Sequence, residues 1–268
     1  MKLLAPFEKL INPLPLIVIN LAVILLAEFA GGGTFFAETG LVHAIAFLFV
    51  ALILVRIFSD YAFSDYILKG FLKIQLAFFL FLGLVHVYEY VGLHVFMIED
   101  EVIEFSATIS YFLWILGMLL AIEFVSRIYY KKSAIFTAIL GAVVALGAGV
   151  IVALNIEDEF VHNLPAWSTF LMLLAIVGVG GAGIASLLRI RKIMPIFKEF
   201  SYYAIPSIVL LLLTSIAEYF EATHTLTDFG VSEVQNLYIA HFFIYAALSL
   251  LLVGFGKLKK PQGIYADM

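Results

Sequence analysis

The stretch FLKIQLAFFLFLGLVHVYEYVGLH, residues 71–94, joins a long apolar run to two histidines and a glutamate. A helix rises about 1.5 Å per residue, so about 20 apolar residues match the hydrocarbon thickness of a bilayer. His86 and Glu89 lie inside the end of this run, with no Lys or Arg nearby. Ionisable groups at membrane depth are costly and are functional candidates for that reason. The stretch therefore predicts a membrane helix that carries a buried Glu/His site.

The rest of the chain has the composition of an integral membrane protein. Hydrophobic residues make up 64% of the sequence and charged residues 13%, with a mean hydropathy of +1.10, whereas soluble domains are about half apolar. The absence of cysteine excludes disulfides, thiolate ligands and iron–sulfur clusters. We expect an all-α, polytopic membrane protein with eight transmembrane helices, at about residues 13–31, 40–58, 70–95, 104–129, 134–154, 164–188, 202–223 and 234–256.

The basic residues lie at one set of span ends, and this pattern predicts the orientation. They are Lys2, Lys9, Arg56, Lys69, Lys73, Arg127, Lys131, Lys132, Arg189, Arg191, Lys192, Lys198, Lys257, Lys259 and Lys260. Because Lys and Arg favour the cytoplasmic side, we expect a multi-pass cell-membrane protein with both termini in the cytoplasm. The scattered basic residues serve topology and indicate no nucleic-acid partner, which leaves the lipid bilayer as the predicted partner. No pattern indicates an oligomeric state.

The opposite span ends collect most of the acidic residues and all six histidines, without any Lys or Arg. Carboxylates at membrane depth must be paired, protonated or bound to a cation. We expect the acidic loop residues 99–101 and 157–158 to be solvated. For Glu89, Glu218 and His86, which lie inside their spans, we expect a functional role because metal ions or protons must balance any buried charge.

The two halves of the chain resemble each other, which predicts an internal repeat. ETGLVH at residues 38–43 aligns with EDEFVH at residues 157–162, so that His43 corresponds to His162. Glu89 with His94 corresponds to Glu218 with His224, although the spacing differs by one residue, and Glu104 corresponds to Glu233. We therefore expect two parallel four-helix repeats, residues 1–132 and 133–268, because an even number of spans returns the second copy to the orientation of the first.

Each half would bring glutamates and histidines to one end of a four-helix unit. The predicted metal ligands are His43, Glu89, His94, Glu104, His162, Glu218, Glu221, His224 and Glu233. Imidazole with carboxylate suits Fe, Mn or Zn, and a mixed Glu/His set inside a helical bundle is typical of carboxylate-bridged metal sites. The spacing Glu221-x-x-His224 places both groups on one helix face. The leading hypothesis is therefore metal-dependent redox chemistry at the extracytoplasmic face, in a metal-dependent oxidoreductase.

Three other functions remain open from the sequence. His86 and His241 have no counterpart in the other half and are candidate cofactor ligands, since pairs such as His43 with His86 could bind haem b axially. A metal-ion or proton transporter is a second alternative, although the cytoplasmic halves of the spans carry few polar groups. An intramembrane zinc hydrolase, with Glu89 as general base, is a third. The substrate could accordingly be a quinone, a lipid or a metal ion.

Overall fold

The computed structural model describes residues 40–61, 66–97, 113–125, 127–128, 166–192, 194–222 and 230–258, together with residues 18, 21, 22 and 25. Within these residues the protein is all-helical and contains no strand. The elements are α3 (Leu41–Tyr61), α4 (Tyr66–Val91), the π-helical segment η2 (Gly92–Phe96), α8 (Ala166–Ile190), α9 (Pro195–Ala222) and α10 (Glu233–Gly256). A shorter helical segment covers Leu113–Val125.

Four of these helices are long and apolar enough to cross a membrane. The candidate spans are Leu41–Tyr61, Ile67–Val91, Pro195–Ala217 and Val234–Gly256. They match four spans expected from the sequence, except that α9 begins at Pro195 rather than at residue 202. Proline is tolerated at the first position of a helix because its missing N–H would have no intrahelical partner there. Helices of this length and hydropathy indicate a lipid bilayer as the environment of the protein.

The other four expected spans are described by the structure in part or not at all. The sixth appears as α8, and the segment 113–125 covers part of the fourth. The fifth lies outside the described residues, and the first has only four described positions. Eight spans and the two repeats, residues 1–132 and 133–268, therefore stay predictions.

Helix boundaries follow local sequence signals at the end of the bundle where α3 and α10 begin. Gly40 has a positive φ of 65° immediately before α3, and Gly230 has a φ of 78° in the turn before α10. Such backbone angles are readily adopted only by glycine. Ser232 then caps α10, because its side chain accepts from the N–H of Gln235 while the Gln235 side chain accepts from the N–H of Ser232. This reciprocal arrangement is a capping box, which fixes where the helix starts.

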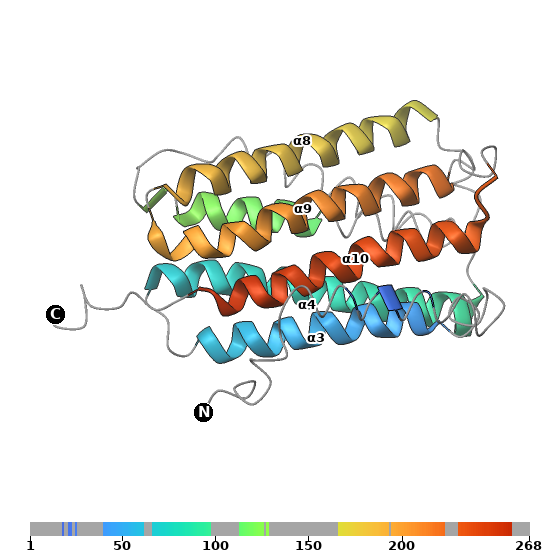
Figure 1. Ribbon diagram of the computed structural model, residues 1–268, viewed down its shortest axis with the longest axis horizontal. Helices are drawn as coiled ribbons and strands as arrows, with labels where there is room; N and C mark the ends of the chain where they lie inside the picture. The colour runs from blue at the N-terminus through green and yellow to red at the C-terminus, as the bar shows by residue number, and fades with distance from the viewer. Residues whose placement is uncertain are drawn as a thin grey trace.

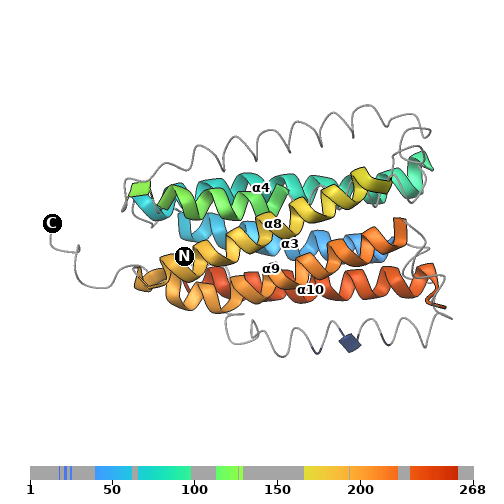
Figure 2. The same ribbon diagram turned by 90° about the horizontal axis from the view of Figure 1, so that it is seen from above.

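The long helices run side by side in a bundle, in the order α8, α9, α10 and α3 across Figure 1. Figure 2, turned by 90°, places α3 between α4 and α10. Two contacts show that α3 and α10 run in the same direction. The Tyr245 hydroxyl donates to the carbonyl of Val42 at 2.7 Å near the start of α3, and Arg56 Nη2 donates to the carbonyl of Gly256 at 3.4 Å near its end.

Aromatic side chains fill the interior of the bundle towards the end where α4 and α9 begin. Phe79 of α4 makes edge-on contacts with both Trp114 and Phe255, at 5.6 and 5.7 Å between ring centroids. Phe71, also on α4, contacts Phe197 and Phe200 of α9 in the same manner. Edge-to-face packing of this kind is favoured by the ring quadrupoles. The aromatic core therefore joins α4 to α9 and α10, which are distant in sequence.

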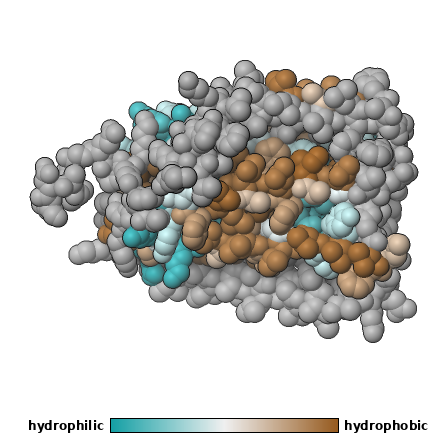
Figure 3. All heavy atoms as spheres, turned by 90° about the horizontal axis from the view of Figure 1, so that it is seen from below, coloured by the Kyte–Doolittle hydropathy of each residue, from teal (hydrophilic) through white to brown (hydrophobic). Residues whose placement is uncertain are grey.

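Large apolar side chains also lie on the outside of the described helices. Figure 3 shows hydrophobic residues across the middle of one face, with hydrophilic residues towards one end and a smaller hydrophilic patch among the hydrophobic ones near the other. Leu48, Phe58 and Leu84 are exposed by 57%, 68% and 67%, respectively. Apolar side chains that face outward along membrane-length helices are the expected contact with lipid tails.

Close packing between α4 and the segment 113–125 depends on a glycine. A Cβ atom at Gly117 would lie 2.3 Å from Cγ of Phe78, and Gln75 Nε2 donates to the Gly117 carbonyl at 3.4 Å. We expect Gly117→Ala to destabilise the protein by about 1–3 kcal/mol, because the aromatic ring attached at Cγ must shift in a packed interior. Thermal unfolding in detergent, followed by circular dichroism, measures this loss.

The matched control is Gly181→Ala in α8. An added Cβ there meets no atom of the described residues within 4 Å, so the change should gain about 0.5–1 kcal/mol from the better helix propensity of alanine. Equal effects of the two substitutions would contradict the packing role of Gly117.

Candidate metal centre

Glu89 lies at the centre of a buried polar cluster formed where α4 ends and α3 begins. These two helices are antiparallel neighbours, so His43, in the first turn of α3, meets the last turns of α4. His86 precedes Glu89 by three residues, and this spacing puts both side chains on one helix face. The cluster therefore follows from two local facts: the i,i+3 spacing of His86 and Glu89 on α4, and the short connection after α3 that lets α4 return beside it.

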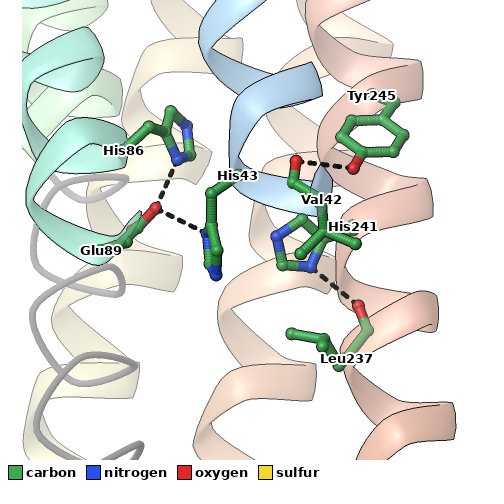
Figure 4. Close-up of polar contacts among 7 residues, drawn as sticks. All are labelled: Val42, His43, His86, Glu89, Leu237, His241 and Tyr245. Atoms are coloured by element: carbon green, nitrogen blue, oxygen red, sulfur yellow. Dashed lines mark hydrogen bonds and ion pairs between the residues drawn. The ribbon is translucent and has the colours of Figure 1, made fainter. Parts of the chain in front are cut away.

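The two imidazoles converge on one carboxylate oxygen. His43 Nδ1 lies 3.1 Å from Glu89 Oε2, and His86 Nδ1 lies 2.5 Å from the same atom. Figure 4 shows the carboxylate between the two rings. A carboxylate oxygen can only accept when ionised, so both Nδ1 atoms act as donors in this arrangement. Two protons thus point at a single oxygen atom.

The cluster is shielded from solvent. His43, His86 and Glu89 retain exposures of only 7%, 1% and 2%. The second carboxylate oxygen, Glu89 Oε1, is buried and has no hydrogen-bond partner among the described residues. Burying an ionised carboxylate costs several kcal/mol unless charge and hydrogen bonds compensate for it. Within the described part of the chain, the ion pairs of this carboxylate involve only the two histidines.

The donor set fits a metal ion. One ligand atom from each of His43, His86 and Glu89 can be chosen so that all three lie within 4.8 Å of one another. Ligand atoms about 2.0–2.2 Å from one ion lie about 3–4 Å apart, so small side-chain rotations would bring these three onto a common centre. The buried carboxylate oxygen Oε1 supplies a further acceptor for such an ion.

His241 of α10 adjoins the cluster from the other side. Its ring meets the ring of His43 nearly at right angles, with the centroids 5.1 Å apart. Its Nδ1 lies 2.9 Å from the carbonyl of Leu237, one turn earlier in α10. His241 is 5% exposed and also contacts the ring of Tyr245. The cluster and the adjacent His241 together therefore involve three helices, α3, α4 and α10.

The backbone changes form directly after the cluster. α4 ends at Val91 and continues as the π-helical turn Gly92–Phe96, which is closed by Met97 with a φ of 53°. π-helical turns occur frequently at functional sites. His94 lies in this turn, but only its backbone is described, so its predicted role as a ligand stays a prediction.

The other predicted ligands are not brought together by the described part of the structure. The backbones of Glu218 and Glu221 lie in the last turns of α9, and Glu233 is the first residue of α10, but their side chains are not described. Glu104, His162 and His224 lie outside the described residues. Of the predicted metal ligands, the structure therefore places the side chains of His43 and Glu89 in one cluster.

The sequence pattern gives His86 and His241 less weight than the repeated residues, because neither has a counterpart in the other half. The structure places both beside the repeated pair of His43 and Glu89. Two sequence signals favour them independently of the repeat. His86 shares a helix face with Glu89, and His241 lies eight residues inside its span, at a depth where an unpaired imidazole is unfavourable.

Comparison with known proteins does not add to this picture. No family model, curated protein or solved structure matches the chain. The functional interpretation of the cluster therefore depends on the chemistry and geometry of its own residues.

Proposed function

We propose that this protein holds a divalent metal ion within the membrane, ligated by His43, His86 and Glu89, and uses it for redox chemistry. The observation that carries the proposal is the convergence of two buried imidazoles on one buried carboxylate oxygen. In the absence of metal, two shared protons occupy the space between these groups. A divalent ion would replace them, since metal binding to histidine and carboxylate is coupled to loss of protons.

The ligand types narrow the choice of ion. Two imidazoles and one carboxylate suit Fe, Mn or Zn, and with open positions they are the ligand set of non-haem iron oxygenases. The chain has no cysteine, which removes the soft thiolate ligands that favour Cu(I). When bound, an iron or manganese ion would supply one-electron redox chemistry to a substrate that reaches it from the membrane.

Each residue has a separate task in this proposal. Glu89 supplies the negative charge that offsets the ion and fixes its place between α3 and α4. The imidazoles of His43 and His86 supply neutral nitrogen ligands from the two helices. The three side chains are buried, so the electrostatic attraction between the carboxylate and the ion is stronger than at a surface.

The geometry favours a small ion over haem. In an axially ligated haem, the iron and its macrocycle occupy the space between two imidazoles. Here the carboxylate of Glu89 lies between His43 and His86 and bonds to both.

Metal content and the visible absorption spectrum test the proposal directly. We expect detergent-purified protein to contain near-stoichiometric Fe, Mn or Zn by elemental analysis and to show no Soret band. A Soret band would instead make the histidines axial haem ligands. Protein that holds neither metal nor haem, and binds no added divalent metal, would contradict the proposal and leave a proton-sharing cluster.

Glu89→Gln keeps the volume of the side chain but removes its charge. We expect this variant to bind metal at least about tenfold more weakly, because loss even of an outer-shell partner of a ligand weakens metal affinity about 10–100-fold. Added metal should also raise the unfolding temperature of the wild type but not of the variant. At a metal concentration of about 100 Kd, binding stabilises the native state by about 2.7 kcal/mol.

The matched control for Glu89→Gln is Tyr88→Phe. Tyr88 is the neighbouring residue on α4, and its side chain is 37% exposed, on the outside of the helix. We expect Tyr88→Phe to retain wild-type metal content. The same loss in both variants would show that changes in this turn act through the helix rather than through a ligand.

We further propose that the cluster lies near the extracytoplasmic face and that both termini are cytoplasmic. Val231 and Lys257 flank α10, whose 24 residues span about 36 Å. Because the chain has no cysteine, single cysteines at these positions can be labelled selectively. An impermeant maleimide should label Val231→Cys in intact cells but Lys257→Cys only after permeabilisation. The reverse pattern would overturn the orientation.

A further inference from the structure

We infer that His241 is a fourth ligand of the same ion, contributed by α10 through its Nε2 atom. This inference rests on the proposed metal site, but it adds a residue from the other end of the chain. It is carried by three observations on His241: its distance from His43, the hydrogen bond that orients its ring, and the contact that fixes α10 against α3.

The separation of the two rings matches joint ligation. An imidazole nitrogen lies about 2.0–2.1 Å from a bound metal such as zinc, which puts the ring centroid about 3.2 Å from the ion. When the angle between the two metal–nitrogen bonds is tetrahedral, the two ring centroids then lie about 5.2 Å apart. When that angle is a right angle, they lie about 4.5 Å apart. The rings of His43 and His241 are 5.1 Å apart with an interplanar angle of 80°. This edge-to-face separation is one that two ligands of one ion can have. The groups whose ligand atoms already lie within 4.8 Å of one another are His43, His86 and Glu89, so His241 would complete the set by moving closer to them on metal binding.

The hydrogen bond from His241 to Leu237 leaves the Nε2 atom of His241 available to bind a metal ion. A backbone carbonyl can only accept, so Nδ1 of His241, 2.9 Å from the Leu237 oxygen, must carry the proton. In a neutral imidazole the lone pair is then on Nε2. Figure 4 shows the nitrogen that is not bonded to Leu237 on the side of the ring that faces His43. Histidines that bind metals almost always donate their other N–H in this manner, which fixes the ring for ligation.

α10 is held at this position independently of any ion. One turn after His241, the Tyr245 hydroxyl donates to the carbonyl of Val42 at 2.7 Å. Val42 immediately precedes His43, so this bond sets the height of His241 relative to the His43 ring. His241 is also only 5% exposed, so its ring lies inside the bundle beside the ring of His43.

The resulting set of three imidazoles and one carboxylate comes from α3, α4 and α10. It leaves one or two positions free on a five- or six-coordinate ion, which a substrate or water could take. Metal binding would then join α10 to the helix pair α3–α4.

Cobalt(II) bound to the full-length protein in detergent tests this inference, because its visible bands report the number and type of ligands. We expect His241→Ala to bind Co²⁺ about 100-fold more weakly than wild type, and its bands to shift with the loss of one nitrogen ligand. Loss of a direct ligand should cost at least as much as loss of an outer-shell partner, which is about 10–100-fold. Added imidazole should enter the vacated space and restore the wild-type bands.

Two further variants make the result decisive. Ile239→Ala, on the exposed side of α10 (43% exposed), removes no proposed ligand and no contact used to place His241, so it should bind Co²⁺ with wild-type affinity and bands. His241→Gln, closer in size to histidine, replaces His241→Ala if the latter does not fold, and should show the same weakened binding. Unchanged affinity and bands at position 241, together with loss of binding in Glu89→Gln, would overturn this inference alone. Absence of Co²⁺ binding in the wild type would overturn the proposed metal site as well.

Discussion

A carboxylate inside an apolar helical bundle requires compensation, and much of the structure around Glu89 serves this requirement. The side chain is 2% exposed, and its Oε2 atom accepts from two histidines on two helices. In a low-dielectric interior, an unbalanced charge would cost several kcal/mol. The charge must therefore be met locally, by protons shared with the imidazoles or by a bound cation. The proposed metal site is the second of these two solutions, built on the same atoms.

The arrangement of the helices determines which groups can meet this charge. The antiparallel pair α3 and α4 brings His43 opposite Glu89, and the parallel neighbour α10 adds His241 beside His43. Aromatic contacts of Phe71 and Phe79 hold the other end of α4 against α9 and α10. Rigid packing at one end of the bundle thus supports a polar cluster near the other. The π-helical turn after Val91 ends the regular helix just beyond that cluster.

The buried cluster and its neighbours include residues from both predicted halves of the chain. Sequence similarity pairs His43 with His162 and Glu89 with Glu218, so that each half would bring its own histidines and glutamates to one end of a four-helix unit. In the structure, His43 contacts His241, which belongs to the second half. His86 and His241, the two histidines that no repeat explains, are the ones that surround the repeated pair. A repeat identifies equivalent positions along the chain, but it contains no information on which helices of different halves become neighbours.

The sequence by itself determined the class of the protein and much of its local structure. Hydropathy and length predicted helices over residues 40–58, 70–95, 164–188, 202–223 and 234–256, and the structure has α3, α4, α8, α9 and α10 there. Periodicity also placed His86 and Glu89 on one helix face, because residues three apart in a helix always share a face. The apolar composition and the lack of charged partners near Glu89 are sufficient by themselves to make this position a functional candidate.

Only the tertiary structure decided which side chains meet. In lipid, apolar helices are not distinguished from one another by hydrophobicity, so their order depends on shape and on a few polar contacts. The close fit of Gly117 against Phe78 and the hydrogen bond from Tyr245 to Val42 are such contacts. They leave little trace in a hydropathy pattern, because one glycine or tyrosine looks like another in an apolar run. The meeting of His241 with His43 follows from this packing, which joins residues about 200 positions apart.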